Sequence, residues 1–182
     1  MPCWGGRDVD GKKAGEGQNT YINGDRYVGS WKNDVREGYG IMYYADGDRF
    51  EGAWANDARH GAGVYCSAGG GRREGEWRED KRHGRSTMYR ANGDREEDEW
   101  REDKRHGRST YSYANGDREE DEWREDKLHG RCTKYLANVS AISFAGMFLS
   151  GRPWCLWCAV NGIPVCGCCT ICCLFCCIQE QA

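Results

Sequence analysis

The fold of this chain is decided by a short stretch that ends in a tryptophan, Asp46-Gly47-Asp48-Arg49-Phe50-Glu51-Gly52-Ala53-Trp54. Related copies of the stretch recur every 23 residues. One tryptophan in each copy keeps this period: Trp31, Trp54, Trp77, Trp100 and Trp123. A fixed period of this size is typical of repeat architectures, in which each unit covers the apolar face of its neighbour. We therefore expect a tandem array.

Each copy has the local pattern of a β-hairpin. Pairs such as Asp46-Gly47 favour tight turns in which both central residues have φ > 0. The run after the pair alternates, so that Phe50, Gly52 and Trp54 lie on one face of a strand. The glycine between the aromatic residues leaves a gap that a neighbouring ring can fill. The pattern predicts an all-β fold, an elongated single-layer array of tandem antiparallel β-hairpins.

The later copies depart from this pattern. Charged residues replace the aromatic one that opens the strand, namely Arg73, Glu96 and Glu119. These changes leave open whether residues 77–138 pack as regular hairpins, and the charged run 94–106 also suits an exposed helix. We favour hairpins, because Asn-Gly-Asp recurs at the same period and no apolar stripe supports a helix.

Three segments follow from the pattern: a flexible N-terminus (1–7), the repeat array (8–138) and a cysteine-rich hydrophobic tail (139–182). Nine of the 12 cysteines lie between Cys155 and Cys177. Residues 154–178 carry no charge and are long enough to span a bilayer as a helix, although Pro164 interrupts them. We expect the tail to be either helical or disordered.

The tail has three interpretations: a membrane attachment, a metal site, or an extension without selected structure. Attachment could use a spanning segment or S-acylation, which needs several chains for stable anchoring. The candidates for acylation are seven cysteines, Cys166, Cys168, Cys169, Cys172, Cys173, Cys176 and Cys177. We favour attachment, because a zinc site needs well-separated cysteine pairs and a polar shell.

Composition excludes several classes of function. The net charge of −3 gives no basic field for nucleic acid, so we expect no nucleic-acid partner. The N-terminus has no apolar segment of a secretory signal, and the repeats hold only Cys66 and Cys132, which favours a reducing, cytoplasmic location. The histidines at the repeat period, His60, His83, His106 and His129, are interpreted as turn residues. No catalytic motif occurs, so we expect no catalytic residue, cofactor or metal site.

The pattern Asp-Gly-Asp-Arg-Phe-Glu-Gly-x-Trp, followed by Arg-His-Gly-x-Gly, resembles the MORN repeat (membrane occupation and recognition nexus) over residues 8–138. The resemblance implies an elongated array of antiparallel hairpins. It also implies a scaffold at membranes or cytoskeletal structures, or a targeting module attached to an enzyme.

The leading hypothesis is a non-enzymatic scaffold or adaptor that binds protein or membrane lipid and is tethered to an intracellular membrane by the cysteine-rich tail. Its expected location is cytoplasmic, in association with a membrane or the cytoskeleton. Exposed aromatic residues at the better-packed end are the predicted contacts: Tyr27, Trp31, Tyr43, Tyr44, Phe50 and Trp54. One alternative is a truncated targeting or regulatory module of an enzyme such as a phosphatidylinositol phosphate kinase. A second alternative is a metal-binding protein that uses the tail. The end hairpins expose strand edges, which permits homo-oligomers.

Overall fold

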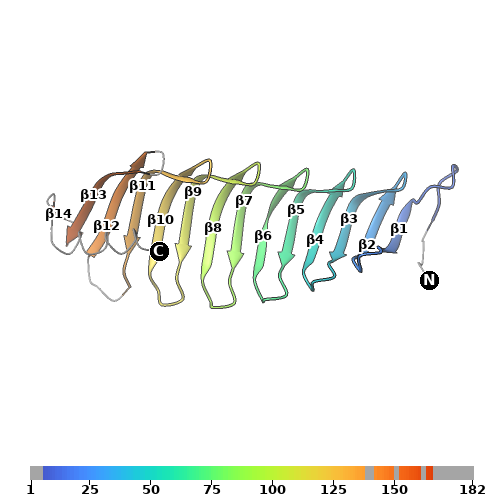
Figure 1. The fold of residues 1–182 in the computed structure, drawn as a ribbon, viewed down its shortest axis with the longest axis horizontal. Helices are drawn as coiled ribbons and strands as arrows, with labels where there is room; N and C mark the ends of the chain where they lie inside the picture. The colour runs from blue at the N-terminus through green and yellow to red at the C-terminus, as the bar shows by residue number, and fades with distance from the viewer. Residues whose placement is uncertain (1–5, 138–141, 150–151, 161–162, 166–182) are drawn as a thin grey trace.

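The computed structural model describes residues 6–137 in full and, beyond them, the backbone of residues 142–149, 152–160 and 163–165. These residues form one open sheet of 14 strands, whose order in space is their order in the chain. Figure 1 shows the strands side by side in a long, narrow layer, with the loops along its two edges. The predicted all-β, single-layer array is confirmed.

The strands, all antiparallel to their neighbours, are β1 (Gly15–Thr20), β2 (Arg26–Lys32), β3 (Val35–Tyr43), β4 (Arg49–Ala55), β5 (Ala58–Cys66), β6 (Arg72–Arg78), β7 (Lys81–Tyr89), β8 (Arg95–Arg101), β9 (Lys104–Ser112), β10 (Arg118–Arg124), β11 (Lys127–Tyr135), β12 (Ile142–Leu149), β13 (Arg152–Val160) and β14 (Ile163–Val165).

Each repeat is a seven-residue strand and a nine-residue strand, joined by a two-residue turn and followed by a five-residue loop. We number the units from the first strand of each pair: unit 1 (26–48), unit 2 (49–71), unit 3 (72–94), unit 4 (95–117) and unit 5 (118–137). Strands β7 to β11 follow the same plan as β2 to β6. The charged later units therefore form hairpins, and the helical alternative for residues 94–106 is wrong.

The tight turns differ from the prediction. The two-residue turns with positive φ at both positions lie between the strands of a unit, with φ of 51° and 68° at Asn33 and Asp34. The predicted site, Asp46-Gly47, lies in a longer loop where only Gly47 has positive φ, at 93°. There the Gly47 amide donates to the Tyr44 carbonyl (3.0 Å), so the glycine closes a wider hairpin loop.

Each nine-residue strand of the repeat contains a bulge, and the bulge explains why a glycine such as Gly38 recurs at the repeat period. Gly29 faces Gly40, whereas Trp31 faces Arg36, so β3 carries two more residues than β2 across this interval. Gly38 lies within the bulge with φ of 98°, a conformation that L side chains rarely adopt. The histidines of the period lie next to this bulge, inside β5, β7, β9 and β11, and not in turns as expected.

The hydrophobic core lies on one face of the sheet, which we call the aromatic face. Tyr27 and Phe50 are completely buried, and Trp54 is only 4% exposed. The Phe50 and Trp54 rings meet edge to face, with centroids 5.4 Å apart. The gap predicted at the glycines is real: the side chain of Tyr27 occupies the space beside Gly40, where a Cβ atom would collide with it.

Successive units are fastened by a repeated arginine–aspartate contact. The Asp57 carboxylate accepts hydrogen bonds from the Arg36 amide (2.9 Å) and Nε (3.0 Å), 21 residues upstream. The Arg36 guanidinium also lies over the Trp54 ring, 4.3 Å from its centroid. Equivalent aspartate contacts join three further pairs, Arg59–Asp80, Arg82–Asp103 and Arg105–Asp126. The repeat period is therefore built into the hydrogen bonding between units.

The first part of the tail forms β-strands, whereas we expected a helix or a disordered chain. Strands β12, β13 and β14 continue the sheet beyond β11. Residues 144–148, Phe-Ala-Gly-Met-Phe, repeat the aromatic-x-Gly-x-aromatic pattern two residues out of period, and Gly146 faces Cys132 as Gly75 faces Gly63. The sequence can therefore pair with the open edge of β11.

Among the described residues, none forms a helix with the length and apolar character that a membrane crossing requires. The seven cysteines proposed for acylation, at 166–177, lie outside the described residues.

Candidate binding surfaces

The six aromatic residues expected to contact a partner divide into two groups. Tyr27, Phe50, Trp31 and Trp54 are at most 5% exposed, so the expectation that they are exposed is wrong. They were misassigned because sequence alternation shows which residues share a face, but not how fully neighbouring rings cover them. Tyr43 and Tyr44 are half-buried, and partner contact stays a prediction for them.

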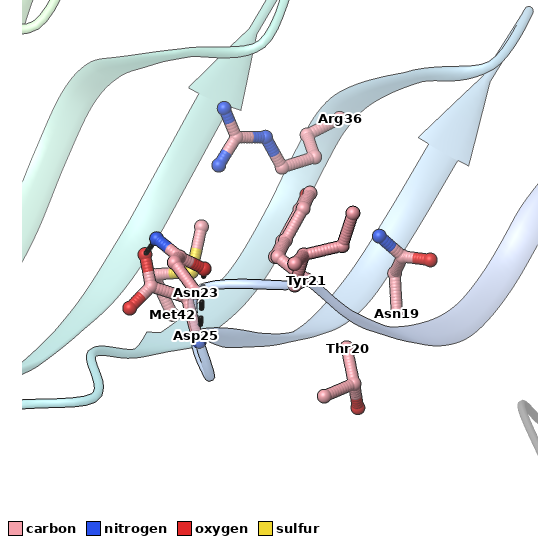
Figure 2. Close-up of a pocket in the computed structure, with 8 residues that line it drawn as sticks. Asn19, Thr20, Tyr21, Asn23, Asp25, Arg36 and Met42 are labelled. Carbon is pink, nitrogen blue, oxygen red and sulfur yellow. Dashed lines mark hydrogen bonds between the residues drawn. The ribbon is translucent and has the colours of Figure 1, made fainter.

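A hollow of about 650 Å³ opens on the aromatic face near the N-terminal end of the array. Figure 2 shows Tyr21 from the β1–β2 loop and Arg36 from β3 facing the same space. The remaining lining residues are Asn19, Thr20, Ile22, Asn23, Asp25 and Met42. Its size is within the range of small-molecule and side-chain pockets.

At the hollow, unit 1 has a methionine where unit 2 has a tyrosine. In unit 2 the Tyr65 ring lies 6.2 Å from that of Tyr44, and its hydroxyl donates to the Asp48 carboxylate. That hydrogen bond holds the pKa of Asp48 below its usual value. Met42 takes the place of Tyr65 and offers no hydroxyl to Asp25, whose partner is Asn23 Nδ2 instead (2.8 Å).

Tyr21 and Ile22 line the hollow, and sequence reasoning did not single them out. Tyr21, Tyr44 and Tyr65 are partly buried and pack against the core. Ile22, at the tip of the loop, is fully exposed. The signal was present in the sequence, because Tyr21 and Tyr44 occupy the same position of the 23-residue period. Their location on the aromatic face is evident only from the conformation of the five-residue loop that carries them.

In units 3 to 5 the aromatic face becomes polar. Asp98 takes the place of a core glycine, and its side chain is 1% exposed. Burial, with the Glu96 carboxylate as a second cause, raises the pKa of Asp98 to about 6. Glu96 is paired with Arg90 (2.5 Å) and Arg105 (3.6 Å), whereas the nearest cation to Asp98 is Arg73 at 3.9 Å.

Unit 5 combines two carboxylates and a thiol on the same face. Glu119, Asp121 and Cys132 place one ligand atom each within 4.8 Å of one another. The Tyr113 hydroxyl donates to Glu119 Oε2 (2.8 Å), and the Cys132 thiol donates to Glu119 Oε1 (3.8 Å). Burial and the nearby carboxylates raise the pKa of the Cys132 thiol. This is the single group of possible metal ligands found in the described part of the chain.

The opposite face of the sheet is charged and regular. The first strand of each of units 2 to 5 has an arginine and a glutamate two residues apart that pair side by side: Arg49–Glu51, Arg72–Glu74, Arg95–Glu97 and Arg118–Glu120. Tyr39 lies on this face, is 58% exposed, and donates to Glu51 (2.6 Å). Such exposed pairs add little to stability, and they leave the face available to a polar partner.

Comparison with known protein families agrees with this architecture. The MORN repeat family matches residues 27–49, 50–72, 74–95, 99–118 and 122–138. A search of curated proteins finds no match. Among solved structures, the SAS-4 (dCPAP) TCP domain in complex with a proline-rich motif of Ana2 (dSTIL) of Drosophila melanogaster is 15% identical. The alignment covers 81% of this chain and 83% of that one, with a TM-score of 0.46.

The five matches fall on the five units that the strands define, and they include more than half of the sequence. MORN repeats are generally non-catalytic and mediate binding to proteins or membranes. The chain therefore belongs to the MORN repeat family.

Proposed function

We propose that this protein is a non-enzymatic scaffold whose N-terminal units bind a protein partner and whose cysteine-rich tail attaches it to the cytoplasmic side of an intracellular membrane. The observation that carries the proposal is the hollow of about 650 Å³ beside Tyr21, Arg36 and Met42. It joins an apolar wall to a guanidinium and to the Asn23–Asp25 pair, a combination that suits a mixed apolar and polar peptide.

The hollow lies at the N-terminal end of the array, where the residues of the aromatic face are aromatic and not acidic. Units 1 and 2 have an aromatic core, and the partly buried Tyr21, Tyr44 and Tyr65 surround it. Units 4 and 5 have Glu96, Asp98, Glu119 and Asp121 on the same face, where units 1 and 2 have aromatic residues and glycines. A partner side chain would bury apolar area at the N-terminal end, where tyrosine rings can form the central contacts.

Proximity labelling with the full-length chain tests the partner site. We expect Met42→Glu to abolish labelling of proteins that the wild type labels, because a carboxylate would enter the apolar wall of the hollow. Tyr39→Ala, on the opposite face, is the matched control and should leave the labelled set unchanged. Loss of the set in both variants, or in neither, contradicts the assignment of the hollow.

The tether is tested separately by membrane fractionation. A full-length variant with serine at the seven cysteines from Cys166 to Cys177 should move from the membrane fraction to the supernatant, if acylation supplies the anchor. A variant with serine at Cys66, in β5, controls for the loss of a thiol elsewhere. Unchanged membrane recovery of the seven-serine chain would rule out acylation as the anchor.

A further inference from the structure

We propose that Glu119, Asp121 and Cys132 form a binding site for one divalent transition-metal ion, with Zn²⁺ as the preferred ion. Glu119 and Asp121 lie two residues apart on β10, and Asp121 faces Cys132 of β11 in the strand register. Their ligand atoms converge within 4.8 Å of one another. A metal ion could therefore contact all three side chains without a change of backbone.

The site occupies a place that the fold fills with an aromatic ring elsewhere. The corresponding residues of unit 1 are Tyr27, Gly29 and Gly40, each 92 residues earlier in the chain. There the ring of Tyr27 covers the two facing glycines. In unit 5 three shorter ligating side chains surround that place, so the repeat geometry itself directs them toward a common point.

Unit 4 has the same pair of carboxylates with arginines around them, although both oxygens of Asp98 are buried without a hydrogen-bond partner among the described residues. Glu96 pairs with Arg90 and Arg105, and Arg73 is the nearest cation to Asp98. One period later, these three arginine positions hold Tyr113, Leu128 and Glu96. Glu119 and Asp121 therefore have no arginine at any of the three equivalent positions. The thiol of Cys132 stands at the position that Ser109 occupies one period earlier.

The cluster also contains a buried oxygen atom that no hydrogen bond satisfies. Asp121 Oδ1 is completely buried and has no hydrogen-bond partner among the described residues. Such an oxygen is costly to bury without a donor or a cation. The Cys132 thiol is the side chain that interacts most closely with the Asp121 carboxylate, whereas Arg105 and Lys134 act on it only through longer-range attraction. A bound cation would satisfy this oxygen directly.

The donor set identifies the class of ion. Two carboxylates and one thiolate suit Zn²⁺, which accepts sulfur and oxygen ligands in a four-coordinate site, and a water molecule can supply the fourth position. Ca²⁺ and Mg²⁺ prefer oxygen ligands alone. Binding releases the thiol proton to solvent, so three ligand charges of −1 meet one charge of +2.

The test uses Co²⁺ as a spectroscopic probe and the full-length chain with serine at the 11 cysteines other than Cys132. We expect one equivalent of Co²⁺ to produce a sulfur-to-cobalt charge-transfer band, and Zn²⁺ to displace it. Glu119→Gln and Asp121→Asn should each weaken Zn²⁺ binding at least tenfold, because each removes an anionic ligand while keeping the shape of the side chain.

Two controls separate a three-residue site from a lone thiol. Glu120→Gln, on the opposite face of the same strand, should bind as the parent does. Ser86→Cys, combined with Cys132→Ser, places the thiol opposite Asp98 and away from Asp121. This variant should not bind, because the Arg73 guanidinium already contacts position 86 (3.0 Å) and Asp98 (3.9 Å). Far-UV circular dichroism confirms that each variant is folded. The proposal is overturned if no cobalt band forms, or if both carboxylate variants keep the parent affinity.

Discussion

At the level of single residues, the repeat depends on an aromatic ring that covers two glycines facing each other across neighbouring strands. Phe50 covers Gly52 of its own strand and Gly63 of the next strand, which face each other in the register. A Cβ atom at Gly63 would lie 2.5 Å from Phe50 Cζ. The glycine is therefore required by the ring, since Gly63 does not have positive φ.

Gly63→Ala should lower the free energy of unfolding by about 1–3 kcal/mol, as expected when a methyl group is forced into a packed core. Urea unfolding followed by tryptophan fluorescence measures this change. Gly69→Ala is the matched control, because the atom nearest to its Cβ would be Ser67 Oγ at 3.8 Å. Equal stability of the Gly63 and Gly69 variants would contradict the packing account.

Asp98 should make stability depend on pH. Its folded pKa of about 6 exceeds the ordinary value of 3.8, so the folded chain holds the proton more tightly than the unfolded chain. As pH rises from about 4 to about 7, the wild type should therefore lose stability relative to Asp98→Asn, by on the order of 2 kcal/mol. Urea unfolding of both chains across this range is the measurement. A difference that stays constant with pH would contradict it.

The sequence predicts the residues of the aromatic face but not their accessibility. Alternation places Phe50, Gly52 and Trp54 together, and the structure confirms it. Alternation says nothing of the Arg36 guanidinium above Trp54, since that contact joins residues of different units. The cluster of Glu119, Asp121 and Cys132 was visible only as three departures from the repeat pattern. Their convergence required the register between β10 and β11.

At the level of elements, the repeat period predicts where the strands begin, but the sequence does not show which of the two connections is the two-residue turn. Two kinds of connection alternate in the chain, and both contain residues that tolerate positive φ. The Asp-Gly and Asn-Gly pairs are the stronger signal for a two-residue turn, yet the structure uses Asn33-Asp34 and its equivalents. The second residue of the short turn also bonds to the neighbouring unit, as Asp57 does with Arg36. Rules based on neighbouring residues cannot predict that contact, because its partners lie 21 residues apart.

This arrangement predicts where the turns can be improved. Glu79 adopts φ of 52° at the first turn position of unit 3, where units 1 and 2 have asparagine. Glu79→Asn should raise the free energy of unfolding by roughly 0.5–1 kcal/mol, because asparagine tolerates the left-handed region better. Asn56→Glu, the reverse change one unit earlier, should lower it by a similar amount. Urea midpoints that move in the same direction for both variants would contradict this account.

At the level of the whole molecule, the array has two ends with different chemistry. The N-terminal units bury aromatic residues, and the later units carry an acidic, arginine-paired network on the same face. A sheet with contacts only between neighbouring units tolerates this change, because each unit is stabilised by the next one rather than by a shared centre. A partner site at one end and a metal site at the other can therefore coexist on one continuous face.

The same independence predicts that the array can be shortened by a whole period. Residues 77–99 and 100–122 differ at only three positions, so deletion of 77–99 joins Glu76 to Trp100 within an intact strand pattern. We expect far-UV circular dichroism per residue to stay unchanged, and the maximum dimension from small-angle scattering to fall by about 10 Å, the width of two strands. Deletion of residues 77–88 alone removes about half a period and shifts the aromatic positions out of register with the next unit, so that chain should lose cooperative unfolding. If both deletions unfold alike, the units do not fold as interchangeable modules, and the length of the array is fixed by contacts beyond nearest neighbours.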